Sequence, residues 1–482
     1  MPVTKNNNNA FPVLLSIGTI LFIYVSLRAY LLSFTWDESY TFLVYVHKNI
    51  FIDLVFNKMS GNNHLLNTGL MMLFSKLFGT SEFVLRLPNV LSYLIFLYFS
   101  GKIVADFQNK FLVIGAFLII NLNPYLLDFF SLARGYGLST AFMICSLYYA
   151  YIYSTKNFSI RYVIYSLLFG AIGVLSHMTL LNYFLPLVLI FLTINFKRTF
   201  LAEKKLFVKN SLLILIVPII ILSFIIPLIL KMKAADAFFY GGDSGFWKDT
   251  VNSLIYSTLH ENSYSFLSQL TIKFFIAFIL ISSLIIVIQS ILKKTIASKE
   301  SFLLVLLAII TLTVITTYCS HKFFGTKFLI QRTGLYLIPL FNVTCVFLLN
   351  ALAEKKKALQ NICFLVSIFV VINFINCMNF NYVLEWKPDA DTKNMIADVE
   401  KIHQSSNEKT TVRTEKFFDT PIDFYRVTHN LTWLNVINEK HILNNKNEFY
   451  FGTKEGMSNF TNDSLQIIKS YAFTKNVLAA RY

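Results

Sequence analysis

Charged residues are scarce in this chain of 482 residues. Only 14% of them are Asp, Glu, Lys or Arg, whereas 55% are hydrophobic and the mean hydropathy is +0.58. A soluble protein of ordinary composition carries about 25% charged residues. This shortage excludes an ordinary soluble protein. Several apolar runs also approach the roughly 20 residues needed to cross a bilayer, so the sequence predicts a polytopic membrane protein.

Cysteine is equally scarce, and acidic residues are fewer than basic ones. The five cysteines lie in or beside apolar runs and none forms a CxxC pair, which argues against a disulfide framework or a zinc site. The chain has 42 Lys and Arg against 26 Asp and Glu, for a net charge of +16. Much of this excess lies in short loops between apolar runs. That placement favours topology-setting charge over nucleic-acid binding.

The apolar runs divide the chain into two parts. Residues 1–380 are predicted to form the transmembrane part and residues 381–482, which are polar and mixed, a small C-terminal soluble α/β domain. The fold class is therefore an all-α polytopic membrane protein of about 11 transmembrane helices with this domain attached. The spans are expected near residues 11–31, 87–105, 111–123, 137–154, 162–180, 183–196, 211–230, 267–291, 301–319, 334–351 and 361–380.

The segment 62–79 decides the predicted topology. Its apolar core is short for a span and Lys76 interrupts it, so we interpret it as an amphipathic helix lying on the membrane. The short Lys/Arg-rich loops then all fall on the side of the N-terminal tail, as cytoplasmic loops do. Residues 33–86 form the first outer loop, and the C-terminal domain is also outside. If 62–79 crossed the membrane instead, every one of these loops would change sides.

An acid pair, Asp37 and Glu38, follows the first apolar run in "SFTWDESYTF". A carboxylate near the membrane surface can serve as general base toward a hydroxyl acceptor. The alternative is a solvated helix start, in which Thr35 or Asp37 caps a helix and the acids lie at its positive end. The sequence alone leaves both interpretations open.

Basic and histidine side chains are expected on the same outer face as the acid pair. Single Arg or Lys residues at span ends commonly extend their head groups toward water, but several beside two carboxylates could hold a phosphate at headgroup level. His64 and His177 are too far apart in sequence to predict a metal site and are interpreted as hydrogen-bonding residues. The basic set comprises Arg86, Arg134, Lys322, Lys327 and Arg332.

Five motifs, in order, resemble those of type-C glycosyltransferases, such as protein O-mannosyltransferases, lipid A aminoarabinose transferases and rhizobial lipopolysaccharide galacturonosyltransferases. The acid pair resembles their Asp-Glu motif. The resemblance covers roughly residues 10–350 and leaves the C-terminal domain without a match. The other motifs are "NNHLLNTGLMMLFSKLFGTSEFVLRLPNVLS", "NPYLLDFFSLARGYGLSTAF", "GVLSHMTLL" and "QRTGLYLIPLF".

The first of these motifs departs from the family pattern at two places. Leu65 replaces the Pro that many relatives have after the His, and "GNNH" lacks the usual basic residue before it. A phosphate contact at that position is therefore in question, and Lys322 or Arg332 is expected to serve instead.

The resemblance implies an integral membrane glycosyltransferase. It would move a sugar from a polyprenyl-phosphate carrier to a lipid, glycan or protein acceptor on the outer face of the cytoplasmic membrane. It implies Asp37 as the base that deprotonates the acceptor hydroxyl and Glu38 as a residue that orients acceptor or base. The implied substrate-binding residues are His64, Arg86, Arg134, Tyr136, His177, Lys322 and Arg332.

The remaining expectations concern cofactors, partners and location. No cofactor or metal site is assigned, although the acid pair could bind a divalent cation, with Asp128 as a further candidate ligand. The partners are the lipid-linked donor, the acceptor and membrane lipids, without nucleic acid. The expected location is a bacterial inner membrane, with the N terminus in the cytoplasm and the active site and C-terminal domain in the periplasm.

Two other functions compete with sugar transfer. A transporter or flippase for lipid-linked sugars would also need many spans and outward basic residues, but it should show internal repeats or charges deep in broken helices. No convincing repeat is visible in the sequence. An O-antigen polymerase or ligase would have its large outer loop late in the chain, whereas the long outer loop here follows the first span.

Overall fold

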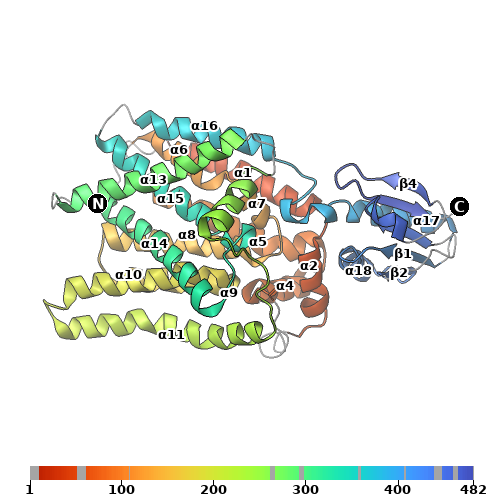
Figure 1. The fold of residues 1–482 in the computed structure, drawn as a ribbon, viewed down its shortest axis with the longest axis horizontal. Coiled ribbons are helices and arrows are strands. Elements are labelled where there is room, and N and C mark those ends of the chain that lie inside the picture. Colours follow the sequence, from red (N-terminus) through yellow and green to blue (C-terminus); the bar gives the residue numbers. More distant parts are fainter. Residues whose placement is uncertain are drawn as a thin grey trace.

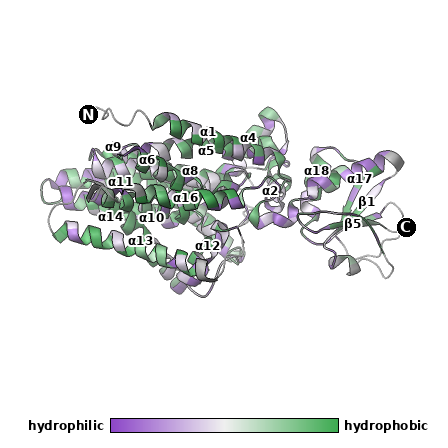
Figure 2. Cartoon of the chain, turned by 90° about the horizontal axis from the view of Figure 1, so that it is seen from above, coloured by the Kyte–Doolittle hydropathy of each residue, from purple (hydrophilic) through white to green (hydrophobic). Residues whose placement is uncertain are grey.

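The chain folds into a long helical bundle that carries a small sheet domain at one end. The computed structural model describes residues 10–50, 61–107, 109–260, 266–292, 298–355, 360–406, 409–438, 448–459 and 465–480. Most long helices run along the long axis of the molecule (Figure 1). The start of the first described helix, at Phe11, and the sheet domain lie toward opposite ends in both Figure 1 and Figure 2.

An apolar helix forms in each of the eleven predicted span ranges. These helices are α1 (Phe11–Leu31), α5 (Glu82–Val104), α6 (Lys110–Asn121), α8 (Gly135–Thr155), α9 (Ile160–Ser176), α10 (Leu181–Thr199), α11 (Lys204–Ala234), α13 (Phe266–Leu292), α14 (Ser298–Phe324), α15 (Leu337–Lys355) and α16 (Gln360–Cys377). Six of the described helices are long and apolar enough to cross a membrane. A multi-pass membrane protein is therefore confirmed, and eleven spans remain a compatible prediction.

A break between α6 and α7 (Pro124–Phe130) explains why α6 has only 12 residues. The two helices meet at a bend of 63°, and together they are long and apolar enough for a seventh span. Pro124 has no N–H group with which to continue the hydrogen bonds of α6. The side chain of Asn123 accepts a hydrogen bond from the N–H of Leu126 and so caps the new helix.

Short helices gather at the end of the bundle that faces the sheet domain. Among them are α2 (Trp36–Thr41), its continuation η1 (Phe42–Val46) and α4 (Leu65–Phe78); α2 lies beside α18 (Asp419–Thr428) in Figure 1. Helix α4 occupies the segment interpreted as a surface helix. Its 14 residues give a length of about 21 Å, too short for a hydrocarbon core of about 30 Å. Four more short elements are η2 (Met178–Leu180), η3 (Phe246–Val251), α12 (Asn252–Thr258) and η4 (Gln331–Gly334).

The C-terminal domain is a five-stranded sheet with helices, as the sequence predicts. Strand β1 pairs in parallel with β2 and β3, β5 is antiparallel to β3 and β4, and the strand order is β2-β1-β3-β5-β4. In the register, Val412 lies opposite both Val436 and Phe449. The elements are η6 (Leu384–Asp389), α17 (Thr392–Ser406), β1 (Thr410–Thr414), α18 (Asp419–Thr428), β2 (Leu434–Ile437), β3 (Glu448–Gly452), η7 (Gly456–Asn459), β4 (Gln466–Ser470) and β5 (Val477–Ala480).

The sheet domain packs directly against the start of α2. The ring of Phe424 stacks on Phe34, with their centroids 4.0 Å apart. The hydroxyl of Tyr425 accepts a hydrogen bond from the N–H of Phe34 at 2.9 Å and donates one to Glu82 at 3.2 Å. All three of these aromatic side chains are buried. The acid-pair segment is thus enclosed by residues from both ends of the sequence.

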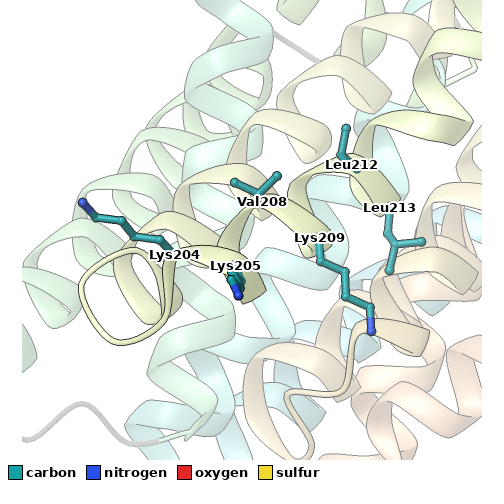
Figure 3. A pocket seen from close by; sticks show the side chains of 6 residues that line it. All are labelled: Lys204, Lys205, Val208, Lys209, Leu212 and Leu213. Atoms are coloured by element: carbon teal, nitrogen blue, oxygen red, sulfur yellow. The ribbon is translucent and has the colours of Figure 1, made fainter.

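A hollow of about 590 Å³ lies at the opposite end of the bundle, at the start of α11. Figure 3 shows three lysines beside apolar side chains of the same helix. Because one helix supplies the whole lining, this hollow is an open face and not an enclosed site. The basic α10–α11 connection therefore lies far from the acid pair. The lining residues are Lys204, Lys205, Val208, Lys209, Leu212 and Leu213.

Candidate functional site

The acid pair lies in the first turn of α2, where a capping box starts the helix. The side chain of Thr35 accepts a hydrogen bond from the N–H of Glu38, and the carboxylate of Glu38 accepts one from the N–H of Thr35. The interpretation of this segment as a helix start is therefore correct, with Thr35 as the cap. The acids are not solvated, however: Asp37 is 7% exposed and Glu38 is fully buried.

Glu38 forms a saturated ion pair with Arg86 of α5. The guanidinium contacts both carboxylate oxygens, at 2.8 and 2.7 Å, and its remaining three N–H groups bond to the carbonyls of residues 29, 32 and 33. The N–H of Ala133 also donates to Glu38, at 2.5 Å. All five donors of Arg86 are thus used within the protein. This pair fixes α2 against α5 and the chain before α8.

Asp37 lies between two other arginines. Its Oδ2 atom is 3.3 Å from Nη2 of Arg134 and 3.9 Å from Nη2 of Arg332. Arg134 also donates from Nη1 to the carbonyl of Asn62 at 3.0 Å, which ties the chain before α4 to the same point. The Asp37 carboxylate therefore has two cationic neighbours that come from distant parts of the sequence.

Three rings pack against one another beside these arginines. The centroid of Tyr136 lies 4.1 Å from that of His177 and 5.1 Å from that of His64, and the two histidine rings are 4.7 Å apart. Gly135 makes this packing possible, because a Cβ atom there would lie 1.9 Å from the carbonyl oxygen of Ser176. The close approach of the chain around residues 135 and 176 brings His177 against Tyr136.

Both histidines are held neutral. Burial, followed by the positive charge of Arg134, lowers the pKa of His64 well below its ordinary value of 6.5. Burial and the charges of Arg134 and Arg332 lower the pKa of His177 to about 3. At neutral pH each ring thus offers one N–H donor and one nitrogen acceptor. This state matches the predicted role as hydrogen-bonding residues.

Several buried polar atoms at this site have no hydrogen-bond partner within the described part of the chain. Such atoms are uncommon in folded proteins and call for an explanation. Here they belong to neighbouring side chains, next to the two arginines, which is the pattern expected where a polar ligand binds. The atoms are Oδ2 of Asp37, Nδ2 of Asn63, Nε2 of His64 and Nε of Arg134.

Arg332 is held by residues that the sequence analysis did not assign to the site. Its backbone N–H and its guanidinium both donate to Glu385, which also accepts from the hydroxyl of Tyr125. The rings of Tyr240 and Trp386 lie 4.4 and 5.0 Å from the guanidinium carbon. Glu385 and Trp386 sit in "NYVLEWKPDADTKN", where the composition turns polar after the last apolar run. In the sequence, this change in composition predicted a domain boundary, but it did not indicate that Glu385 and Trp386 belong to the site.

Eight of the nine predicted site residues come together here, namely Asp37, Glu38, His64, Arg86, Arg134, Tyr136, His177 and Arg332. Lys322 does not. It is exposed at the end of α14, with its ammonium over the ring of its neighbour Phe323. Lys327, another member of the basic set, pairs with Asp243. Of the two candidates for a phosphate contact, only Arg332 therefore lies next to the acid pair.

The predicted divalent-cation option finds no matching group of ligands in the described residues. No three His, Cys, Asp or Glu side chains there are arranged to hold a metal ion. Both oxygens of Glu38 are taken by Arg86. Asp128 belongs to a separate cluster, in which it pairs with Arg28 at 2.5 Å and lies 3.3 Å from His260. That cluster anchors the start of the C-terminal region, because Asp128 also accepts from the N–H of Leu384.

Comparison with known proteins supports the fold described above. Residues 68–224 match the family model described as dolichyl-phosphate-mannose-protein mannosyltransferase. The structure of ArnT from Cupriavidus metallidurans in the apo state superposes with a TM-score of 0.56 and 9% sequence identity, over 98% of this chain and 97% of that one. The same protein bound to undecaprenyl phosphate gives 0.53 and 10%, with the same coverage. No curated protein matches significantly in sequence.

These findings confirm the resemblance to type-C glycosyltransferases inferred from the motifs. The fold match extends over nearly the whole chain, including the C-terminal region that gave no family signal. The family model covers Arg86, Arg134 and His177 but begins after the acid pair. The roles of Asp37 and Glu38 therefore depend on the geometry described above.

Proposed function

We propose that this multi-pass membrane protein with the type-C glycosyltransferase fold transfers a sugar from a polyprenyl-phosphate carrier to an acceptor hydroxyl, with Asp37 as the base. One observation carries the proposal. The buried carboxylate of Asp37 faces two arginines and keeps an oxygen with no hydrogen-bond partner among the described residues. A carboxylate base that is paired with arginines, but whose oxygen accepts no hydrogen bond from them, suits hydroxyl transfer to a phosphate-linked sugar.

Arg332 and Arg134 hold the donor phosphate. A guanidinium presents N–H groups that match phosphate oxygens, and low exposure strengthens each contact. Arg332 is bound to Glu385 in the structure, so the phosphate replaces this carboxylate as the partner of the guanidinium. The comparison protein that was crystallised with undecaprenyl phosphate has the same overall fold. This likeness supports a polyprenyl phosphate as the carrier.

Transfer proceeds by attack of the acceptor oxygen on the anomeric carbon. A new C–O bond forms there while the bond from that carbon to the phosphate oxygen breaks. The electron pair leaves with the polyprenyl phosphate, and the hydroxyl proton passes to Asp37. The arginines stabilise the negative charge that grows on the leaving phosphate. Low exposure of the site restricts access of water, which would otherwise compete as the acceptor.

The neighbouring residues position these groups. Glu38 and Arg86 hold the start of α2, so Glu38 acts through Asp37 and not on the substrate. His64 and His177 are neutral and can donate to or accept from sugar hydroxyls or phosphate oxygens. Tyr136 keeps the two histidine rings in place. No step is assigned to a metal ion.

The site is placed on the outer face of a bacterial inner membrane, with the N terminus in the cytoplasm. In support, the acid pair and the sheet domain share one end of the bundle, while the N terminus and the lysine-rich α10–α11 connection share the other. Lysine-rich connections favour the cytoplasm. An Asp243→Cys variant should react with a membrane-impermeant maleimide from outside intact cells. Labelling only after the cells are opened would reverse the orientation.

The Asp37→Asn variant tests the proposed base. The amide keeps the shape of the carboxylate but cannot accept the proton, so transfer should fall by at least about 10²–10⁴-fold. Radiolabelled sugar passed from a lipid-linked donor to membrane glycans measures the effect, and thermal unfolding in detergent checks that the fold is intact. Asp243→Asn, at an exposed acid that pairs with Lys327, is the matched control. Normal transfer by Asp37→Asn would remove Asp37 from this role.

A further inference from the structure

The start of α2 is held from outside by residues of the C-terminal region. The carboxyl of Asp389, the last residue of η6, accepts a hydrogen bond from the N–H of Trp36 at 2.6 Å. Trp36 is the first residue of α2, so its N–H has no partner within the helix. On the other side of the helix cap, the hydroxyl of Ser33 donates to the carbonyl of Ala390 at 2.6 Å. We call these two hydrogen bonds the α2 clamp.

The carboxyl of Asp389 is buried and has no cationic partner. Within the described part of the chain it forms no ion pair, and the N–H of Trp36 is its one hydrogen-bond partner. The small hollow beside it contains one other titratable side chain, Tyr382. Two carboxylates, Asp37 and Glu38, lie in the adjoining turn of α2. The cations of the surrounding elements are engaged elsewhere: Arg28 with Asp128, Arg86 with Glu38, Arg332 with Glu385, Lys393 with Glu82, and Lys387 over the ring of Tyr382.

These surroundings favour the neutral form of Asp389. Burial, with a smaller contribution from the charges of Asp37 and Glu38, raises the pKa of the Asp389 carboxyl to about 8. At pH 7 the group is mainly the neutral acid, whose carbonyl oxygen accepts from the N–H of Trp36. Above about pH 8 it becomes a third negative charge next to the acid pair. A buried anion without a cationic partner is costly, so water or a cation must enter and the α2 clamp must loosen.

We infer that Asp389 is a positioning residue for the proposed base, which holds the turn of Asp37 in place as the neutral acid and releases it on ionisation. The inference rests on the proposed function and adds control of the same site by pH. Because Trp36 and Asp37 are adjacent in sequence, a shift of the Trp36 peptide moves the Asp37 carboxylate relative to Arg134 and Arg332. Asp389 thus acts on the base through the backbone of α2.

The ratio of the transfer rate at pH 9 to that at pH 7 tests the effect on function. At pH 9 about a tenth of the molecules keep the proton on Asp389, so wild type should transfer about tenfold more slowly than at pH 7. Asp389→Asn cannot ionise and its amide carbonyl still accepts from Trp36, so its ratio should be about one. Asp389→Ala loses the hydrogen bond at every pH and should transfer more slowly at pH 7 than Asp389→Asn. Asp391→Asn, at a buried acid that accepts from Thr474 instead, is the matched control and should keep the wild-type ratio.

Hydrogen exchange followed by mass spectrometry tests the α2 clamp without a transfer assay. At pH 9, peptides covering residues 34–41 of the full-length protein in detergent should exchange at least about threefold faster in wild type than in Asp389→Asn. At pH 7 the two proteins should exchange alike. If Asp389→Asn fails to fold, wild type alone must lose protection of this segment between pH 7 and pH 9, after correction for the intrinsic exchange rate.

The outcomes separate this inference from the proposed function. Normal transfer by Asp37→Asn would remove the proposed base, while the exchange data would still decide whether Asp389 holds α2. Equal exchange of wild type and Asp389→Asn at pH 9 overturns the α2 clamp. Equal transfer ratios in these two proteins overturn the control by pH. Loss of the alkaline decline in Asp391→Asn as well would overturn its assignment to Asp389.

Discussion

Two neighbouring carboxylates in one helical turn have opposite surroundings. Glu38 accepts five hydrogen bonds, from Arg86, Ala133 and Thr35, and leaves no oxygen free. Asp37 has two arginines nearby, at 3.3 and 3.9 Å, and an Oδ2 atom with no hydrogen-bond partner in the described chain. Both side chains are buried, so exposure does not distinguish them.

From this difference we infer that the number of hydrogen bonds that each carboxylate already accepts within the protein indicates whether it serves the fold or a ligand. A carboxylate whose oxygens are all engaged stabilises the fold and cannot take a proton from a ligand without breaking those bonds. A carboxylate that is paired with cations but has an oxygen without a hydrogen bond can do so. The two clusters also differ in what holds the arginine in place. Arg86 donates to backbone carbonyls at and just after the end of α1, whereas Arg332 is held by Glu385, a side chain that a ligand can displace.

The largest effect on stability is expected from Arg86→Ala. It leaves Glu38 buried without a charge partner, which costs about 3–5 kcal/mol. The protein should fail to accumulate in membranes or should melt far below wild type in detergent. Arg134→Ala is the matched variant in the other cluster and should cost less, because Asp37 keeps Arg332. Equal stability of the two variants would contradict the inferred difference between the Glu38 cluster and the Asp37 cluster.

A smaller effect is expected from acid, through His177. Its pKa is about 3 in the folded protein, against about 6.5 when unfolded, so the unfolded chain binds the extra proton first as the pH falls. Stability should therefore drop below pH 6.5, by about 2 kcal/mol at pH 5 from this group alone. His177→Gln should melt with a weaker pH dependence between pH 7 and pH 5. An unchanged slope would mean that folding does not lower the pKa of His177.

The smallest effect is expected from Glu385→Gln. The neutral amide keeps the size of the side chain but competes less strongly for Arg332, because charge-assisted hydrogen bonds are about twice as strong as neutral ones. Undecaprenyl phosphate should then bind a few-fold more tightly, as measured by thermal stabilisation or fluorescence titration. Weaker binding would instead show that Glu385 orients Arg332 for the phosphate and is not displaced by it.

Much of the helical fold follows from composition. Apolar runs marked the eleven apolar helices of the bundle, and the first, Phe11–Leu31, matches its predicted range. Helix α4 could be predicted to be shorter than a span because Lys76 interrupts an already brief apolar stretch, and its place on the membrane surface stays a prediction. The order of the five strands did not follow, since it depends on contacts between segments far apart in sequence.

The site was predictable where chemistry-bearing residues stand near span ends and match motifs of a family. Asp37, Arg134 and Arg332 could be found in this way. Glu385 could not, because its role depends on how the C-terminal region folds back against η4. Lys322 was assigned by position alone, and the turn after α14 leaves it exposed. The helix start, with Thr35 or Asp37 as its cap, was visible in the sequence as one of two open alternatives, and Thr35 is the cap.

The hydrogen bond from the N–H of Trp36 to Asp389 joins positions 353 residues apart. The ribosome therefore makes the two halves of this contact at very different times. A chain still under synthesis has its first helices in the bilayer while Asp389, Glu385 and Tyr425 do not yet exist. Truncated products that lack the C-terminal region would insert into the membrane but lack these contacts. The site around Asp37 would therefore be complete only when the C-terminal region lies on the same side of the membrane.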